Sequence, residues 1–230
     1  AAAKMGSKVL LITMNLQNIG QMSCNPAMGG IAKGQIIREI DALGGISGIV
    51  SDLSAVQYKM LNKSKGPAMW SPRVQSDRML FASCWRTKLE KIENIDFYQD
   101  TVSSLVFIKN KLSGVKTTLG VKIVSKSVIL TSGTFLNGLI HIGEKQYGGG
   151  RAGERSTFGI TEQLNSLGFI SGRMKTGTPP RVDSRSLDFK KMIEQPGDKK
   201  PRTFSYLSSV KPLKNQLSCY MTFTNSKVHD

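Results

Sequence analysis

The residues best suited to chemistry lie together in the segment 21–34, which combines a cysteine, an Asn-Pro pair and two adjacent glycines. Asn25 is a good helix N-cap and Pro26 suits the first helical position, so we expect a helix to begin here. Gly29 and Gly30 would leave the N–H groups of its first turn uncovered, where an anionic or bulky ligand can approach. The segment therefore predicts a ligand site at a helix N-terminus, with a tight helix crossing as the alternative reason for the glycines.

Cys24 stands directly before this expected helix N-terminus, where positive backbone dipoles favour a thiolate over a thiol. It is our first candidate for a catalytic residue, and a small buried packing residue is the alternative. Cys84 lies on an apolar helical face and Cys219 on an alternating strand, which favours core packing for both. The 3 cysteines lie far apart without metal-ligand spacing, so we predict no metal site and expect reduced thiols in the cytoplasm.

The charge of the chain indicates an anionic partner. It has 32 Lys and Arg against 16 Asp and Glu, a formal net charge of +16. Such a charge attracts polyanions through steering and counterion release, although a solvated lysine-rich surface is the alternative. Cations beside glycines or prolines are the candidate RNA- or anion-binding residues, because they can pair with phosphate or carboxylate: Lys33, Lys65, Arg73, Arg151, Lys175 and Arg181.

Hydrophobic patterning predicts the elements that must position these residues. Expected strands lie at 8–13, 95–99, 128–131, near Phe169 and at 218–224, with an antiparallel meander over 102–124. Expected helices begin at Asn25, at Ser71-Pro72 and about Ser156, and residues 1–6 should end a helix at Gly6. No apolar run approaches about 18 residues, so no membrane span is expected. The first helix should bury one face, made of Ile36, Ile37, Ile40 and Leu43.

This order of elements predicts an α/β fold, a nucleotide-binding doubly wound domain with an antiparallel β insertion. Ligands in such domains bind at the carboxyl ends of the parallel strands, which points to Thr13 and to Ser132-Gly133-Thr134. After Arg181 the composition becomes basic and punctuated by prolines. We therefore expect one domain over 1–182 and the start of a second, incomplete inserted domain over 183–230.

Four long segments resemble a single known family. They are GQMSCNPAMGGIAKGQIIREIDALGG, LNKSKGPAMWSPRVQSDR, VILTSGTFLNGLIHIGEKQYGGGRAGE and GRMKTGTPPRVDSRSLDF. In this order they resemble the MnmG (GidA) family, the large flavin-binding subunits of the bacterial enzyme that modifies the tRNA wobble uridine. The family opens with a strand and a GxGxxG-type turn and continues past Asp230, so we expect an internal fragment that is inactive alone.

The resemblance implies FAD in a domain of the glutathione-reductase type, NADH as reductant and methylenetetrahydrofolate as carbon donor. It implies that a carboxymethylaminomethyl group is added at uridine C5 of tRNA. It further implies a homodimer, a GTP-hydrolysing partner subunit in a heterotetramer, and a cytoplasmic location. Two alternatives remain open, a folate-dependent tRNA uridine C5 methyltransferase of the same fold and a non-catalytic RNA-binding remnant.

The resemblance also implies roles for particular residues. Cys24 would assist attack at uridine C6 or move a proton, and Asp230 matches a family segment near the active site. The backbone of Val102 would hold the adenine of FAD. The full set of expected cofactor-binding residues is Thr13, Asn25, Pro26, Gly29, Gly30, Val102, Ser132, Gly133, Thr134 and Thr157.

Overall fold

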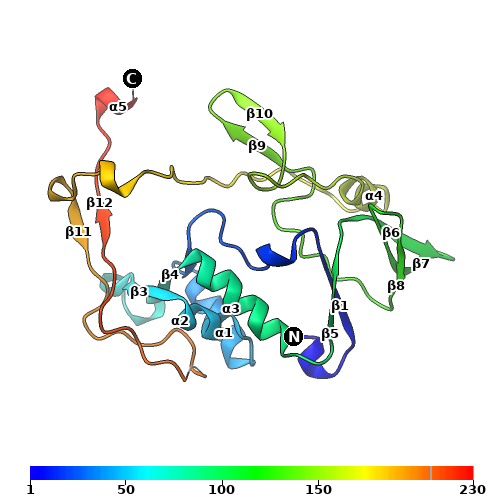
Figure 1. The fold of residues 1–230 in the computed structure, drawn as a ribbon, viewed down its shortest axis with the longest axis horizontal. Coiled ribbons are helices and arrows are strands. Elements are labelled where there is room, and N and C mark those ends of the chain that lie inside the picture. The colour runs from blue at the N-terminus through cyan, green and yellow to red at the C-terminus, as the bar shows by residue number, and fades with distance from the viewer. Residues whose placement is uncertain (208, 230) are drawn as a thin grey trace. The chain divides into compact units, whose positions relative to one another are not determined.

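The chain folds as two compact units, each assembled from separate stretches of sequence. The computed structural model describes residues 1–207 and 209–229 (Figure 1). Unit 1 consists of Ala1, Gly20–Lys91 and the described residues from Gly177 onward, and unit 2 consists of Ala2–Ile19 and Ile92–Thr176. The expected division at 182/183 stays a prediction, whereas the change of compact unit along the chain falls at Gly177.

Unit 2 contains two of the strands expected from the sequence, and they form a parallel pair. Strand β1 (Val9–Thr13) pairs with β5 (Ile95–Gln99), so that Thr13 lies opposite Gln99 at their carboxyl ends. The short 3-10 helix η1 (Ala3–Met5) ends at Gly6, whose φ of 90° confirms the predicted glycine C-cap. Both predictions succeed because apolar runs and C-terminal glycines are local signals.

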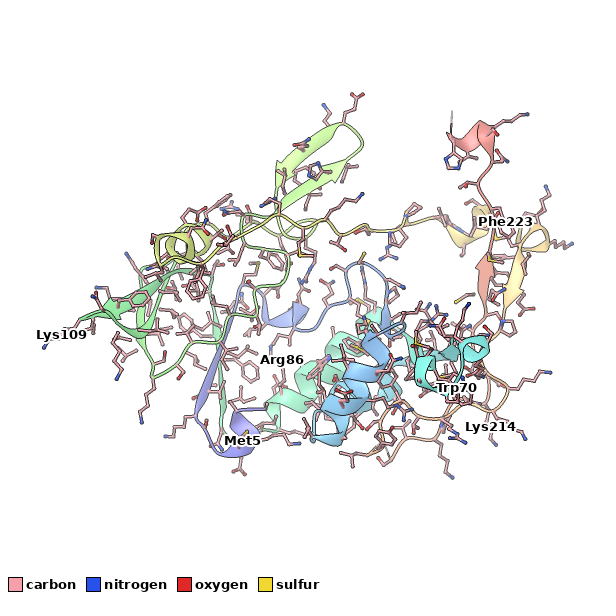
Figure 2. The ribbon with its side chains drawn as sticks, turned by 180° about the vertical axis from the view of Figure 1, so that it is seen from behind. Met5, Trp70, Arg86, Lys109, Lys214 and Phe223 are labelled. Atoms are coloured by element: carbon pink, nitrogen blue, oxygen red, sulfur yellow. The ribbon has the colours of Figure 1, made fainter. Side chains whose placement is uncertain are left out.

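The antiparallel meander of unit 2 is also confirmed. Strands β6 (Val102–Ile108), β7 (Lys111–Thr117) and β8 (Lys122–Val124) pair in that order. Lys109 and Asn110 both have positive φ, 49° and 59°, as a tight two-residue hairpin turn requires. Helix α4 (Ile160–Ser166) completes a core of Leu105, Val115 and Ile160. Figure 2 shows Lys109 at the tip of the β6–β7 hairpin.

Two strands expected in unit 2 are not formed. Ile129 is 76% and Phe169 63% exposed, and neither 128–131 nor the residues around Phe169 belong to a strand. An apolar run becomes a buried strand only when a neighbouring strand takes up its backbone groups, and none of the strands in the described part of the chain pairs with either segment. The hairpin β9 (Leu139–Ile142) and β10 (Lys145–Gly148) follows instead. Helix α4 starts later than expected because Gly159, with φ 98°, precedes it.

Unit 1 is built on a three-stranded antiparallel sheet. Strand β4 (Ser71–Ser76) lies between β2 (Ala27–Gly29) and β3 (Ala55–Leu61). Helices α1 (Lys33–Ala42), α2 (Ser47–Leu53) and α3 (Arg78–Glu90) lie beside one another near this sheet (Figure 1). Tyr58, Val74 and Phe204 form the buried centre of the unit.

Two helix starts predicted for unit 1 are wrong. Residues 27–29 form β2, and α1 begins only at Lys33, so Asn25 and Pro26 do not cap it. The Ser71-Pro72 pair lies in strand β4, and α3 is capped by Asp77, whose carboxylate accepts the Met79 and Leu80 N–H groups at 2.9 Å. Pairing of β2 and β3 with β4 overrides the local capping signal in both cases.

The predicted buried face of the first helix is also wrong in part. Ile37 packs against the core of unit 1, but Ile36 is 55% and Leu43 89% exposed. Gly34 and Asp41 lie on the buried side of α1 instead. A buried aspartate gives no hydrophobic signal, so the periodicity of the isoleucines pointed to the wrong side.

The segment after residue 182 packs against the rest of unit 1. Its strands β11 (Ile193–Gln195) and β12 (Cys219–Met221) form an antiparallel pair, which confirms part of the alternation expected over 218–224. The buried Gln57 amide donates to the carbonyls of Gln195 and Leu217 at 3.1 and 2.9 Å. The remaining short elements are η2 (Leu16–Asn18), η3 (Lys63–Lys65), η4 (Pro67–Met69), η5 (Ser184–Ser186), η6 (Phe189–Lys191) and α5 (Ser226–His229).

Among the described residues, no helix has both the length and the apolar character that a membrane crossing needs.

Candidate functional site

The Cys24 thiol is held by a distant part of unit 1. Its Sγ donates a hydrogen bond to the Gly177 carbonyl at 2.7 Å, and the Thr178 hydroxyl oxygen lies 3.5 Å away. The Arg181 guanidinium donates to the carbonyls of Ser23, at 3.2 Å, and of Cys24. Two of the segments singled out in the sequence, around Cys24 and around Arg181, therefore meet at one partly exposed thiol.

The glycine pair after Cys24 has two different roles. A Cβ on Gly29 would lie 2.2 Å from the Pro72 carbonyl oxygen and 2.7 Å from the Phe204 ring, so close packing excludes any side chain. Gly30 is buried, but a Cβ on it would meet only Leu61 Cδ1, in ordinary contact at 4.0 Å, and its φ is 96°. Its N–H group donates to the Pro72 carbonyl at 2.9 Å. The expected row of uncovered helix amides is therefore absent here, and strand β2 separates Cys24 from the start of α1.

In unit 2, two predicted cofactor contacts flank a buried aspartate. Thr13 ends β1 and Val102 begins β6, and the Asp100 N–H donates to the Thr13 carbonyl at 3.1 Å. The Asp100 carboxylate accepts the Thr101 N–H at 2.7 Å. Hydrogen bonding, first from the Thr117 hydroxyl and then from backbone N–H groups, lowers the pKa of Asp100. The aspartate therefore fixes the backbone where the parallel strands end.

The other predicted contacts of unit 2 form a second group of loops. The Thr134 hydroxyl donates to the Gly150 carbonyl at 2.7 Å. Thr157 is buried, and its N–H donates to the Phe135 carbonyl at 2.8 Å. Gly133, with φ 56°, has only Phe135 Cδ2 near its Cβ position, at 4.0 Å. Ser132 closes this turn by accepting the Phe135 N–H at 3.2 Å.

The six cations predicted to bind RNA or anions lie in different surroundings, and Lys65 is exposed in η3. Arg151 pairs with Glu154 at 3.3 Å and lies over the Phe135 ring, and Arg181 holds the Cys24 loop, so both stabilise the fold. Lys33 donates to the Ala27 carbonyl at 3.3 Å, and Lys175 is exposed. Only Arg73 lies in a cavity among other cations.

That cavity is the feature that sequence reasoning missed. It has a volume of about 390 Å³, and among the described residues that line it 6 are cationic and one, Asp198, is acidic. The cations are Arg38, Lys59, Lys63, Arg73, Lys200 and Arg202. They come from α1, β3, η3, β4 and the segment 198–204, so no spacing in the sequence signals the cluster. Asp230, the second predicted catalytic residue, lies outside the described residues.

Comparison with known proteins gives consistent results over the whole chain. Residues 1–230 match the family model described as "Glucose inhibited division protein A". The chain is 70% identical over 230 residues to proteins of Christiangramia forsetii and Flavobacterium johnsoniae, both named tRNA uridine 5-carboxymethylaminomethyl modification enzyme MnmG. These matches cover 100% of this chain but 37% of each relative, so the chain spans well under half their length.

Solved structures agree with this similarity. GidA of Aquifex aeolicus in its form I crystal is similar to the chain, with a TM-score of 0.90 and 43% sequence identity. The match covers 96% of this chain and 38% of the Aquifex protein.

Proposed function

This chain belongs to the glucose inhibited division protein A family, and on that premise we propose that it forms part of an enzyme that adds a carboxymethylaminomethyl group to C5 of the wobble uridine in tRNA. It would contribute much of a doubly wound FAD-binding domain of the glutathione-reductase type. NADH and methylenetetrahydrofolate would be the co-substrates. The working enzyme would be a cytoplasmic homodimer that joins GTP-hydrolysing partner subunits in a heterotetramer.

The observation that carries the proposal is the arrangement around Cys24. A partly exposed thiol lies in a loop whose carbonyls are held by Arg181, while its own proton points to the Gly177 carbonyl. Both partners belong to a segment far along the chain, so tertiary contacts set the position of this thiol and its loop. Such positioning is what a nucleophile or proton carrier needs.

The glycines allow a test of whether the residues present fit a flavin. Gly133 combines positive φ with an exposed position and only the Phe135 ring near its Cβ position, so a planar ring system can approach its backbone. Gly29 does not fit this role, because Pro72 and Phe204 fill the space. Gly133 therefore supports FAD binding, whereas Gly30 is buried and Gly29 is closely packed.

Bound FAD would supply the redox chemistry of the reaction. Thr13, Val102, Thr157 and the turn at 132–134 would hold it, and Asn25 and Pro26 are the further cofactor contacts that the family resemblance implies. Cys24 would either add its sulfur to uridine C6, which increases electron density at C5, or carry a proton for the base. In either role the hydrogen bond from the Cys24 thiol to the Gly177 carbonyl must break first, because it engages the thiol proton.

The test uses the full-length protein that carries this chain. We expect Cys24→Ser and Cys24→Ala to abolish formation of the modified uridine, measured by nucleoside analysis of tRNA after reaction. Cys84→Ala, which removes the other thiol of residues 20–91, is the matched control and should keep activity. Flavin absorbance of each purified variant shows whether FAD is retained. Normal modification by Cys24→Ala would contradict the role of this residue.

The product distinguishes the proposal from its alternatives. A 5-methyluridine product would favour the folate-dependent methyltransferase. A colourless full-length protein that binds tRNA without modifying it would favour the RNA-binding remnant.

A further inference from the structure

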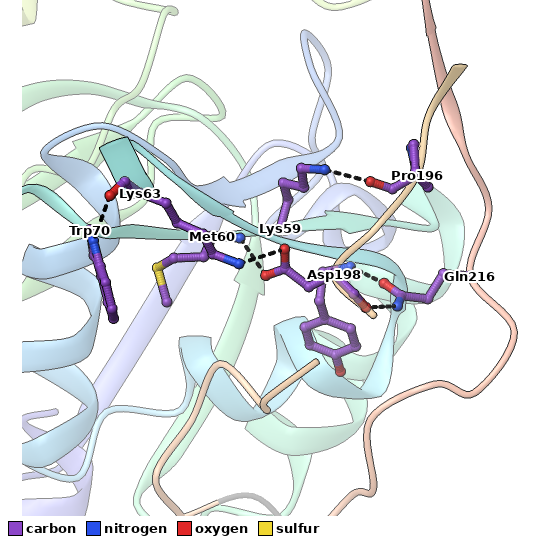
Figure 3. Close-up of polar contacts among 8 residues, drawn as sticks. Lys59, Met60, Lys63, Trp70, Pro196, Asp198 and Gln216 are labelled. Atoms are coloured by element: carbon purple, nitrogen blue, oxygen red, sulfur yellow. Dashed lines mark hydrogen bonds and ion pairs between the residues drawn. The ribbon is translucent and has the colours of Figure 1, made fainter. Parts of the chain in front are cut away.

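The cavity of unit 1 has far more positive charge than its surroundings neutralise. Of the described lining residues only Asp198 is acidic, and its carboxylate already accepts the Met60 N–H at 2.8 Å and pairs with Lys63 at 3.0 Å (Figure 3). Lys59 donates to the Pro196 carbonyl at 2.6 Å, which leaves its charge unpaired. Among the described residues, none of the cations of this cavity other than Lys63 has a carboxylate partner.

The two arginines of the cavity wall have unused donors. The Nε groups of Arg38 and Arg73 are buried and have no hydrogen-bond partner among the described residues. Packing fixes Arg38, because its guanidinium donates to the Thr203 carbonyl at 3.1 Å and lies 4.5 Å over the Tyr206 ring. A buried guanidinium N–H without an acceptor destabilises the fold, because its desolvation is not compensated by a hydrogen bond. A bound phosphate would supply acceptor oxygens with the geometry that a guanidinium group matches.

The opening of the cavity combines exposed cations with an aromatic ring. Lys200 and Arg202 are exposed at its edge, and Trp70 is 44% exposed. The Trp70 indole N–H donates to the Lys63 carbonyl at 3.2 Å, which fixes the ring next to this cation (Figure 3). Lys65 continues the charge onto the adjacent surface, so the basic surface extends beyond the cavity. Cations along a groove with a stacking aromatic are the usual design of a single-strand nucleic-acid site.

We propose that this cavity binds the backbone phosphates of a single-stranded part of the RNA substrate, with Arg73 and Arg38 contacting a phosphate inside and Trp70 stacking on a base at the opening. The inference rests on the proposed function, since it takes RNA as the ligand. An RNA strand suits the site better than a compact dinucleotide, because the charge extends past the cavity along the surface.

The test measures binding of unmodified tRNA to the full-length protein, without turnover, across a range of salt concentrations. The variant Lys200→Gln/Arg202→Gln removes exposed charge and should fold normally. Losing each phosphate contact lowers the slope of log K against log salt by about 0.7–0.9, so we expect a decrease of roughly 1.5. The matched control is Lys109→Gln/Lys111→Gln, which removes the same charge from the β6–β7 hairpin of unit 2 and should leave the slope unchanged.

Two further variants test the interior and the stacking ring. Arg73→Gln should weaken tRNA binding about 10-fold or more, because a charged hydrogen-bonded contact is lost. Trp70→Leu should weaken it at least about 5-fold, whereas Trp70→Phe, which keeps a flat ring, should retain most of the affinity.

The inference is overturned if the cavity and hairpin double variants change the salt slope equally. It is also overturned if the cavity variants weaken NADH binding but leave tRNA affinity unchanged. A wild-type protein that binds tRNA without modifying it would contradict only the proposed function. A protein that modifies tRNA while the cavity variants bind it normally would contradict only this inference.

Discussion

The buried carboxylate of Asp52 binds the backbone N–H of Phe204 at 2.6 Å, although the two residues are separated by 152 positions in the chain. Its second oxygen accepts the Ser205 N–H at 3.0 Å. Asp41 binds the same strip, through the Ser205 hydroxyl at 2.6 Å and the Tyr206 N–H at 2.8 Å. Asp41 of α1 and Asp52 of α2 therefore hold the segment 204–206 in place, and Phe204 of this segment lines the basic cavity.

Replacing Asp52 by Asn should loosen this segment. The amide keeps one acceptor but turns its NH₂ toward a backbone donor, which costs about 2 kcal/mol in a buried site. We therefore expect hydrogen exchange of the Phe204 and Ser205 amides to become about 30-fold faster. Asp183→Asn, at an exposed acid that pairs with Arg185, is the control and should leave these two amides unchanged. Equal protection in both variants would show that Asp52 does not anchor the segment.

Gly29 and Gly66 form a matched pair for testing close packing. Both have left-handed φ, 86° and 90°, but a Cβ on Gly29 meets Pro72 and Phe204 whereas one on Gly66 meets nothing within 4 Å. Gly66, with φ 90° and ψ 161°, lies in a backbone region essentially confined to glycine, so Gly66→Ala should cost only the backbone strain, about 1–3 kcal/mol. Gly29→Ala should cost a further 1–3 kcal/mol or so, because the neighbours must move. The two Tm values measure the difference, and similar values would rule out the clash.

Arg181 should protect the Cys24 thiol through the loop that it binds. Arg181→Gln removes the paired donors to the Ser23 and Cys24 carbonyls. We expect iodoacetamide to alkylate Cys24 several-fold faster in this variant, measured by mass spectrometry of the Cys24 peptide. The Cys84 peptide of the same sample is the internal control, and its rate should not change. A Cys24 rate equal to that of the wild type would mean that the arginine does not order the loop.

Cys84 should react as a thiol with a raised pKa. Desolvation by burial raises its pKa above the ordinary value, and the nearby Lys88 only partly offsets this. The thiolate fraction near neutral pH is therefore reduced, and the alkylation profile of Cys84 should lie at higher pH in the folded protein than in urea. Superimposed profiles would contradict the effect of burial.

Acid should weaken unit 2 through Asp100. Hydrogen bonds from the Thr117 hydroxyl, and then from the Thr101 and Leu119 N–H groups, hold its folded-state pKa below the unfolded value. A lowered carboxyl pKa stabilises the fold above the unfolded pKa of about 3.9, and that stabilisation is lost as pH falls through the folded value. Asp100→Asn should therefore be less stable at pH 7 and show a weaker pH dependence below about pH 5. Thermal unfolding at several pH values checks this, and parallel curves for variant and wild type would contradict it.

The sequence alone predicted the parts of this protein that local signals control. The runs that form β1 and β5, the meander over 102–124 and the cap at Gly6 follow from side-chain alternation and turn residues close together in the chain. Long motifs likewise indicated the family, which the comparisons then established.

Only the tertiary structure decided what surrounds the candidate sites. Local rules placed a helix at Asn25 and another at Ser71-Pro72, but cross-strand pairing of β2, β3 and β4 takes these residues into a sheet. The partners of Cys24 and the cations beside Arg73 come from distant segments. Propensity acts over a few residues, whereas long-range hydrogen bonds and burial choose between local alternatives. For this reason a spacing in the sequence could suggest the thiol but not the arginine that holds its loop.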